Sequence, residues 1–408
     1  MLRVLTLSTL FPDASRPDFG VFVERQTLGL AALPDVTVKV VAPIGLPVWP
    51  LGHLPGHRAF ASVPLHETWK GLDIWRPRFV TVPATSGRLH VAALLRALAP
   101  LLDRLRADFA FDVIDAEFFF PDGPAAAALG RRYRVPVSIK ARGADIHHWG
   151  RGPTAAQVRR AGRRAAGLLA VSEAMKRDMA ALGLDPARIR VHRTGVDLDR
   201  FRPADRVAAK AALGVAGPLI VSVGALIERK GHDIVIAALA DLPEATLLIA
   251  GQGPERHRLE ALVDRLGLGE RVRLLGGVPH ETLPPLFAAA DVMALASSSE
   301  GLANAWVEAL ACGTPVVITD VGGARELLAA PAAGRIAARE PAAFAAAIAT
   351  LLAAPPAAEA VRAAALGYTW PTNAAALAAH LRRLVAAEAS PAGRKALYAD
   401  AVTIGSPA

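Results

Sequence analysis

Two glutamates around the start of a helix are the residues of this sequence best suited to chemistry. Glu300 ends a polar loop, and Glu308 lies inside a helix predicted from about Ala303 to Cys312. The two would lie at most roughly 12 Å apart along the axis. Backbone N–H groups and the positive dipole end between them suit a diphosphate, and each carboxylate could accept hydrogen bonds from sugar hydroxyls. The alternative is that Glu300 only caps the helix and Glu308 is solvated.

The elements that must position these residues follow an alternating pattern. Short apolar runs alternate with helical, alanine-rich stretches, and the series restarts after Arg202-Pro203. This pattern predicts an α/β protein with two Rossmann-like, doubly wound parallel-sheet domains. Residues 43–70, rich in Pro, Gly and His, are predicted to form a long loop. The predicted strands are Arg3–Ser8, Val36–Ala42, Phe111–Glu117, Val135–Ala141, Leu168–Ser172, Ile189–His192, Leu219–Val223, Thr246–Ala250, Val272–Leu274, Val292–Ala296 and Val316–Thr319.

Ligands of such sheets bind beyond the carboxyl ends of the strands, where loops meet helix N-termini. Two domains facing each other are expected to form a cleft, and the chemistry is expected there. A dinucleotide-dependent oxidoreductase is disfavoured, because Arg256 stands where a G-x-G-x-x-G fingerprint beginning at Gly251 needs its third glycine.

The segment around the two glutamates resembles the signature of glycosyltransferase family 4, a retaining family with the GT-B fold. The matching residues are Glu300-Gly301 and the run Glu-Ala-Leu-Ala-Cys-Gly-Thr-Pro-Val-Val from Glu308. The resemblance implies that Glu308 binds the ribose of a nucleotide sugar and that Glu300 lies against its sugar. It also implies that the intervening backbone holds the phosphates, at Gly301, Leu302, Ala303 and Asn304. Cys312 is then a packing residue and not a nucleophile.

The stretch from Val223 to Gly231 resembles the family's basic diphosphate loop and places Gly224 among the donor-binding residues. Arg229 and Lys230 would offset the charge of the departing diphosphate. The family often has Arg directly after this glycine, where this chain has Ala225, so Arg229 is expected to supply the guanidinium. The alternative is an exposed basic pair at the start of a helix.

Further matches lie along the rest of the chain. Gly20, in the loop after the first strand, would let the backbone approach the donor phosphates. The donor base is expected near Gly276–Val278, with Val278 as a contact. Gly195 to Pro203 resembles the family's domain junction, and Tyr368-Thr369-Trp370 its closing element. The implied domains are 1–198 on the acceptor side, 199–367 for the nucleotide sugar, 368–389 as a helix crossing back to the N-terminal domain, and 390–408 as a frayed tail.

The acceptor side departs from the family pattern. Many members have a His near the end of the fourth strand of the first domain, where this chain has Glu117 and Asp122 and no His. Either carboxylate could do a related job, and Glu117 is the predicted catalytic residue. Asp145 and Arg142, in a stretch resembling Arg-Gly-(Ser/Thr)-Asp, are predicted to contact sugar or acceptor. The alternative for this pair is a structural salt bridge.

The net charge of +9 is unevenly spread. Residues 1–200 carry 28 Lys and Arg against 18 Asp and Glu, whereas residues 201–408 carry 18 against 19. A basic half suggests an anionic partner, and the alternative is a solvated basic face. Within Arg151–Arg164, four arginines at i,i+4 spacing predict a stripe that could rest on anionic lipid. No nucleic-acid partner is expected, because such a partner leaves Glu300 and Glu308 unexplained.

Cysteine content and hydropathy indicate the compartment. The single cysteine, Cys312, fits a reducing compartment, and no window reaches the roughly 18 apolar residues of a membrane helix. The protein is expected in the cytoplasm, either soluble or peripheral on the inner face of the cytoplasmic membrane. No catalytic metal is expected, because Asp197-Leu198-Asp199 is a weak pattern and His53 with His57, or His147 with His148, lacks a convincing ligand geometry.

The sequence thus predicts a metal-independent retaining glycosyltransferase of bacterial polysaccharide or cell-envelope biosynthesis. It would transfer a hexose-type sugar from a nucleoside-diphosphate sugar to a saccharide or lipid-linked acceptor by front-face attack. No cofactor is expected besides this donor substrate. The alternatives are a nucleotide-sugar epimerase or hydrolase on the same fold, or a basic nucleic-acid- or membrane-binding protein.

Overall fold

The computed structural model describes residues 1–48, 60, 62–82 and 85–389, which form two compact units. Unit 1 comprises Met1–Arg193 and the chain from Pro371 onward, and unit 2 comprises Thr194–Trp370. The sequence-based divisions lie a few residues away, at 198/199 and 367/368. The N–H of Val196 donates to the carbonyl of Tyr368 (2.8 Å), which keeps both passages of the chain in unit 2. The predicted frayed tail, 390–408, lies outside the described residues.

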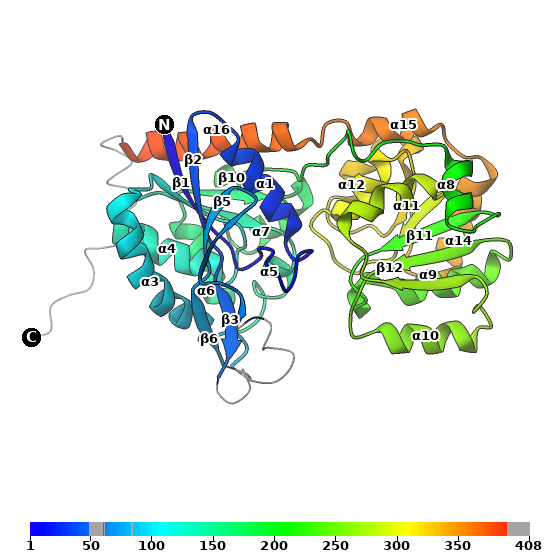
Figure 1. Ribbon diagram of the computed structural model, residues 1–408, viewed down its shortest axis with the longest axis horizontal. Coiled ribbons are helices and arrows are strands. Elements are labelled where there is room, and N and C mark those ends of the chain that lie inside the picture. The colour runs from blue at the N-terminus through cyan, green and yellow to red at the C-terminus, as the bar shows by residue number, and fades with distance from the viewer. Residues whose placement is uncertain (49–59, 61, 83–84, 390–408) are drawn as a thin grey trace, which may run out of the picture. The chain divides into compact units, whose positions relative to one another are not determined.

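Unit 1 contains a sheet whose described strands have the order β10-β9-β8-β7-β1-β2-β5-β4 (Figure 1). Neighbouring strands are parallel, except that β4 is antiparallel to β5. The chain fills one side of β1 first and then the other, so the strand order reverses between β1 and β7. The bounds are β1 (Leu2–Leu7), β2 (Val36–Val41), β4 (His66–Trp69), β5 (Leu72–Trp75), β7 (Val113–Ala116), β8 (Val137–Ala141), β9 (Gly167–Ala170) and β10 (Ile189–Val191).

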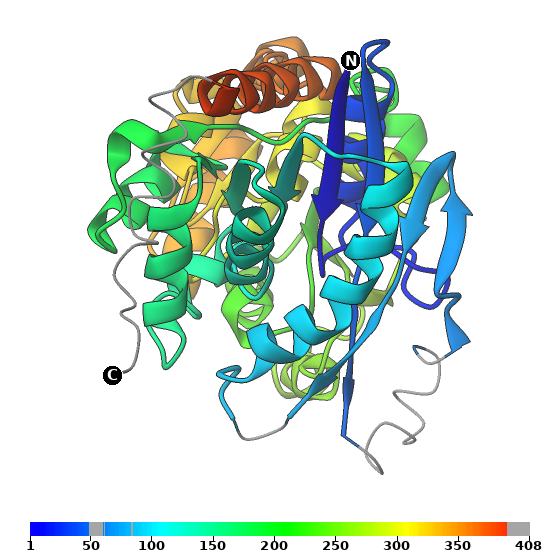
Figure 2. The same cartoon turned by 90° about the vertical axis from the view of Figure 1, so that its left-hand side faces the viewer.

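The helices of unit 1 cover this sheet. Helices α1 and α16 share a buried core with β1 and β2, in which Leu30 and Leu377 are fully enclosed beside Val4. Helices α3, α4 and α6 lie side by side (Figure 2). The bounds are α1 (Val21–Ala31), α3 (His90–Asp108), α4 (Asp122–Tyr133), α5 (Ala144–His147), α6 (Ala155–Arg164), α7 (Glu173–Ala181) and α16 (Trp370–Ala389).

The prediction of one long loop over residues 43–70 is wrong for its described parts. Residues Ile44–Pro47 form β3, which pairs with β6 (Arg78–Thr81), and His66–Trp69 form β4. Strand β4 turns into β5 through Lys70 and Gly71, both at positive φ. Neither β3 nor β4 is a fully buried, mostly apolar run like the equally short β7 and β9, and pairing with neighbouring strands holds them in place. The predicted histidines His53 and His57 lie outside the described residues.

Unit 2 has a second sheet, with all described neighbours parallel in the order β13-β12-β11-β14-β15-β16. Its strand order reverses between β11 and β14. The strands are β11 (Leu219–Val223), β12 (Thr246–Ala250), β13 (Val272–Gly276), β14 (Val292–Leu295), β15 (Val316–Ile318) and β16 (Gly334–Ile336). The helices are α8 (Arg206–Ala212), α9 (His232–Ala238), α10 (Arg256–Arg265), α11 (Leu283–Ala289), α12 (Asn304–Ala311), α13 (Ala324–Leu327), α14 (Pro341–Ala353) and α15 (Ala358–Arg362).

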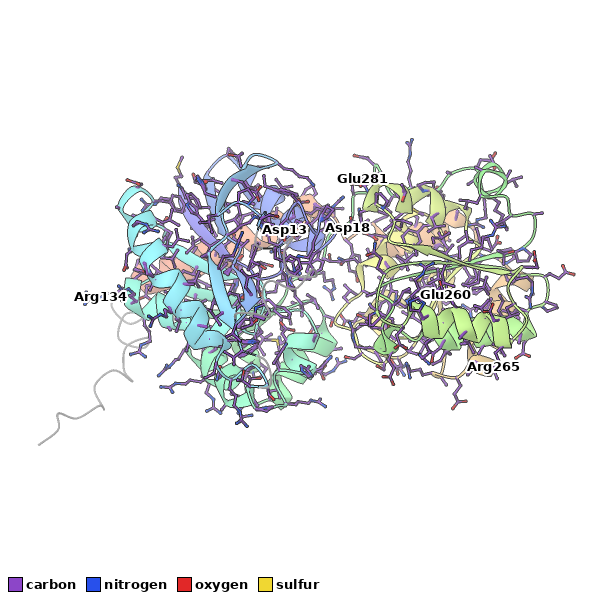
Figure 3. The ribbon with its side chains drawn as sticks, turned by 60° about the horizontal axis from the view of Figure 1, so that its bottom comes forward. Asp13, Asp18, Arg134, Glu260, Arg265 and Glu281 are labelled. Atoms are coloured by element: carbon purple, nitrogen blue, oxygen red, sulfur yellow. The ribbon has the colours of Figure 1, made fainter. Side chains whose placement is uncertain are left out.

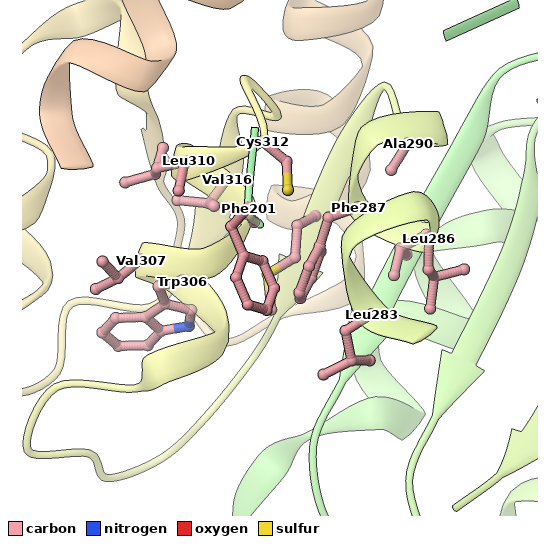
Figure 4. Packing of buried hydrophobic residues seen from close by; sticks show 14 of the residues in the cluster. Phe201, Leu283, Leu286, Phe287, Ala290, Trp306, Val307, Leu310, Cys312 and Val316 are labelled. Atoms are coloured by element: carbon pink, nitrogen blue, oxygen red, sulfur yellow. The ribbon is translucent and has the colours of Figure 1, made fainter. Parts of the chain in front are cut away.

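Two hydrophobic clusters bury the strands of unit 2. One contains residues of α9, α10 and α14, and the other contains residues of α11, α12 and α15. In the second cluster, the ring of Phe201 packs against Phe287 with centroids 6.4 Å apart, close to Trp306 and Leu310 of α12 (Figure 4). The core therefore fixes the helix that carries Glu308.

No helix in the described parts of the chain is both long enough and apolar enough to cross a membrane.

Substitution of Phe201 tests whether this packing stabilises unit 2. Its side chain is 1% exposed, so replacing it with Ala should lower the free energy of unfolding by about 3–5 kcal/mol, as for other buried aromatic residues. Urea denaturation gives this value. Phe19→Ala is the matched control, because Phe19 is 37% exposed and should change stability little. Equal effects of the two substitutions would contradict the assigned core.

Candidate active site

Two loops of unit 2 meet where the strand order reverses. One follows β11 and contains Arg229 and Lys230, and the other follows β14 and leads to Glu300. The backbone N–H of Ser298 donates to the carbonyl of Arg229 (2.8 Å), which joins the loops directly. Gly231 makes this approach feasible, because it has φ 67° and a Cβ there would lie 2.1 Å from the carbonyl oxygen of Ala296.

An ion pair holds Glu300 in this junction. Its Oε1 accepts hydrogen bonds from Lys230 Nζ (2.5 Å) and from Ser297 Oγ (2.8 Å), and Arg229 Nη1 lies 3.4 Å away. Glu300 is only 8% exposed, so its charge is compensated mainly by these partners. The structure thus brings together three residues that the sequence predicted for the site, Glu300, Lys230 and Arg229.

The segment between the two glutamates begins α12. The carbonyl of Gly301 accepts a hydrogen bond from the N–H of Gly323 (2.8 Å), and Leu302 packs against the core. Ala303 is the N-cap residue, and no side chain caps the helix that begins at Asn304. The first turn of α12 therefore keeps N–H groups suited to a phosphate.

Glu308 lies one turn further along α12 and binds a residue that the sequence analysis missed. Its Oε1 is 2.7 Å from Nε2 of His280, whose Nδ1 is 3.0 Å from Arg200 Nη2. His280 lies four residues after the end of β13 and two residues beyond Gly276–Val278, the stretch predicted to approach the donor base. Its position beyond a strand end was the only signal that could have identified it, since no family motif marks it.

The remaining predicted residues of unit 2 lie around these groups. The methylenes of Lys230 pack beside Gly224, and Val278 packs against the cluster that contains α12. Cys312 is buried, and burial together with the charge of Glu308 raises the pKa of its thiol to about 12. A thiol with this pKa is protonated at neutral pH, which fits packing and not nucleophilic chemistry.

In unit 1, Gly20 forms the entry to α1. It has φ 75°, and a Cβ would lie 2.6 Å from the carbonyl oxygen of Leu10. The turn after β1 therefore requires glycine at this position. Asp122 begins α4 beside this turn and accepts a hydrogen bond from the N–H of Thr9 (2.9 Å). Burial raises the pKa of Asp122 to about 7.

Glu117, at the end of β7, is completely buried and paired with Arg142. The guanidinium binds both the carboxylate and the carbonyl of Glu117, the latter at 2.7 Å. Burial alone would raise the pKa of Glu117, but the positive charges of Arg142 and Lys140 outweigh it and hold the pKa at about 2. Glu117 is thus an anion whose charge is compensated inside the protein.

A buried network behind Glu117 was not predicted. Gln26 of α1 donates to Glu117 and accepts from Nζ of Lys140, which is also 2.8 Å from His192 Nδ1. His192 Nε2 in turn lies 2.9 Å from the carbonyl oxygen of Asn373 at the start of α16. Burial and the charge of Arg142 lower the pKa of Lys140 to about 7. Lys140 lies within an apolar strand, so sequence offered no signal for this role.

Asp145 lies next to Arg142 but is held by backbone groups. Its carboxylate accepts hydrogen bonds from the N–H groups of Phe119 (2.9 Å), Arg142 (3.0 Å) and Gly143 (2.7 Å). Burial raises its pKa despite these bonds. This geometry favours a role in shaping the loops after β7 and β8, and Arg142 pairs with Glu117 and not with Asp145. Direct contact of Asp145 with a substrate remains a prediction.

Solved structures that resemble the chain show the same two-domain architecture. Sucrose-phosphate synthase from Thermosynechococcus elongatus is 21% identical with a TM-score of 0.78, and the match covers 95% of this chain and 100% of that one. The Anabaena protein HepE in complex with UDP-glucose is 21% identical with a TM-score of 0.69, covering 94% and 100%. Together with the two Rossmann-like units, these likenesses define the GT-B fold class.

Sequence comparison identifies the family. Residues 29–200 match the model described as glycosyltransferase family 4, and residues 205–368 match the model described as glycosyl transferases group 1. The chain belongs to glycosyltransferase family 4. The D-inositol 3-phosphate glycosyltransferases of Mycobacterium tuberculosis H37Rv and Mycobacterium bovis AF2122/97 are 47% identical over 149 residues, which is 35% of this chain. The match spans about a third (31%) of the length of these relatives.

The Glu117–Arg142 pair should make the free energy of unfolding depend on pH in the acid range. The unfolded glutamate takes up a proton near its ordinary pKa of 4.5, whereas the folded one resists protonation down to about 2, so its stabilising contribution is lost as pH falls through that window. Glu117→Gln should remove this dependence. It should also lower the free energy of unfolding at neutral pH by about 3–5 kcal/mol, because Arg142 loses its partner.

Urea denaturation between pH 6 and pH 3 measures both effects. Glu359→Gln, at an exposed position, is the control and should match the wild type. A Glu117→Gln variant as stable and as acid-sensitive as the wild type would contradict the buried ion pair.

Proposed function

We propose that this protein is a retaining glycosyltransferase that transfers a hexose-type sugar from a nucleoside-diphosphate sugar to a saccharide or lipid-linked acceptor. The observation that carries the proposal is the junction in unit 2 that joins Lys230, Glu300 and the uncapped start of α12. A diphosphate needs N–H donors and cations, and a sugar needs a carboxylate to accept its hydroxyls. The junction offers these groups side by side.

In the proposed reaction, the acceptor hydroxyl attacks on the face of the sugar that the diphosphate leaves, and a diphosphate oxygen takes its proton. The new glycosidic bond forms as the bond between the anomeric carbon and the diphosphate breaks. Negative charge grows on the departing phosphate, and Lys230 and Arg229 would stabilise it. Because these cations bear the charge, the proposed transfer requires no metal ion.

Each remaining residue has a proposed task. Glu300 would accept hydrogen bonds from hydroxyls of the donor sugar, and Glu308, oriented by His280, would bind the ribose. The backbone of Gly301 to Asn304 would hold the phosphates, with Gly224 and Val278 beside the donor. In unit 1, Glu117 with Arg142 and Asp145 would shape the acceptor side.

The comparisons support a nucleotide-sugar donor, since HepE was solved with UDP and with UDP-glucose. The proposed setting is the cytoplasm, in polysaccharide or cell-envelope biosynthesis, with the Arg151–Arg164 region attached to an anionic membrane surface. The second candidate, an epimerase or hydrolase on the same fold, shares the donor site. NMR spectroscopy of the products distinguishes the two candidates. Only a retaining transferase links the sugar to an acceptor with its anomeric configuration unchanged.

Donor-binding measurements test the proposed contact between Glu308 and the ribose. Calorimetry with UDP-, GDP- and ADP-sugars should identify one donor bound by the wild type, and Glu308→Ala should weaken it by about 1.5–3 kcal/mol, the contribution of hydrogen bonds to a charged group. His280→Ala should weaken it less, and the double variant should bind as poorly as Glu308→Ala alone, because His280 acts through Glu308.

Glu270→Ala, exposed in the same unit, is the control and should bind like the wild type. Two results would refute the donor assignment: no nucleotide sugar binds, or binding is indifferent to Glu308.

Turnover measurements test whether Lys230 stabilises the departing diphosphate. Replacing it with Met removes a cation that would stabilise the departing diphosphate, so kcat should fall by roughly a hundredfold to a thousandfold, with a smaller change in KM. Steady-state kinetics with the identified donor measure both constants. A fall in affinity with unchanged kcat would assign Lys230 to ground-state binding instead.

A further inference from the structure

An apolar groove of about 430 Å³ lies between α3, α4 and α6 of unit 1. Val91 and Leu95 of α3, Ala127 and Ala128 of α4, and Ala161 of α6 line it. Ala128 is exposed and Leu95 is half-buried, so the groove opens to solvent. A groove with this lining can take a hydrocarbon chain.

Arginines follow one edge of this groove. Arg160 and Arg164 line the groove, and they also line a second depression of about 400 Å³ together with Arg159 and Arg163. Helix α6 thus has apolar surface on one side of the row Arg160–Arg164 and basic surface on the other. A ligand that satisfied both sides would combine a hydrocarbon chain with an anionic head.

The arginines of α6 differ from those of another helix. On α10, Arg256 lies 2.8 Å from Glu260, and Arg258 bonds to Glu255, so carboxylates offset these charges. Within the described residues, no salt bridge joins Arg159, Arg160 or Arg163 to an Asp or Glu. The charges of Arg159, Arg160 and Arg163 are therefore available to an anionic partner.

The location of the groove connects it with the candidate site. Pro124, at its α4 end, is two residues after Asp122 at the start of that helix. Gln157, at its α6 end, donates to the carbonyl oxygen of Arg88 at the start of α3 (3.1 Å). Beside Arg88, the side chain of Leu89 is 50% exposed, which suits contact with an apolar phase.

We propose that this face binds an anionic phospholipid of a membrane surface, with its phosphate on Arg159, Arg160 and Arg163 of α6 and an acyl chain in the groove between α3, α4 and α6. The inference rests on the proposed membrane attachment and adds a defined site and ligand class to it. It does not require the transfer reaction.

Vesicle sedimentation tests the basic side. The full chain should bind vesicles of phosphatidylglycerol and phosphatidylcholine, and not phosphatidylcholine alone. The triple variant Arg159→Gln, Arg160→Gln, Arg163→Gln should bind on the order of a hundredfold more weakly, because each arginine near an anionic surface contributes about fivefold. Binding should also fall at salt of about 1 M, where charges are screened within about 3 Å.

A second triple variant is the matched control. It carries Arg256→Gln, Arg258→Gln and Arg265→Gln on α10, where Arg265 lies at the C-terminal end of the helix (Figure 3). It loses the same charge but should keep vesicle binding. The α6 triple variant should bind the donor like the wild type, so a failure of this inference is distinguishable from a failure of the proposed function.

Soluble alkyl phosphates test the groove. In calorimetry, affinity should rise roughly fourfold per buried methylene from butyl to decyl phosphate. Ala128→Phe, which fills the groove, should abolish this dependence on chain length. Ala107→Phe, at an exposed position of α3 outside the groove, should retain it. Inorganic phosphate supplies the reference without a chain.

Four results would overturn the proposal. The arginine substitutions on α6 and α10 could weaken vesicle binding equally, which would assign it to net charge. The wild type could show no dependence on chain length, or Ala128→Phe could leave the dependence intact. Duplex DNA could bind as tightly as the anionic vesicles at the same salt, which would favour a nucleic-acid surface.

Discussion

The reversal of strand order between β11 and β14 is the constraint on which the donor side of this protein depends. The connections after these two parallel neighbours run toward opposite edges of the sheet. The loops that follow the strands therefore part at this point, which is where ligands of such sheets bind. Lys230 follows the first of these strands and Glu300 the second, and they meet at 2.5 Å although 70 positions separate them in sequence. Without the reversal, another loop would cover this edge, and the pair could not form.

Helix α12 converts that junction into a site because it serves two purposes at once. Trp306 and Leu310 are completely buried in the core of unit 2, which fixes the axis and rotation of the helix. Glu308 projects from the same helix toward His280. A helix held this firmly can present its first N–H groups to a ligand without reorganising, which is the electrostatic preorganisation that a transfer reaction requires.

Unit 1 contains charged side chains that are buried around its sheet. Glu117, Lys140 and Arg142 are largely removed from water, where isolated ions would be costly. The charges compensate one another, and Gln26 joins them through its amide. His192 extends the network to the first turn of α16. The acceptor-side residues are thereby linked to the last helix by contiguous hydrogen bonds, which makes their positions sensitive to its packing.

Local pattern by itself determined the two α/β domains, most strands of both sheets, and the identity of Glu300, Glu308, Arg229 and Lys230 as candidate residues. These features depend on hydrophobic period and on a contiguous motif, and both are visible along the chain. Strands β3 to β6 were missed because they lack the fully buried, mostly apolar run that marks equally short strands such as β7 and β9. Only the tertiary structure decided that His280 orients Glu308 and that Lys140 lies buried beside Gln26 and His192. It also decided that Asp145 binds backbone and that α3, α4 and α6 enclose a groove. Each of these depends on residues distant in sequence, which the folded chain alone brings within contact.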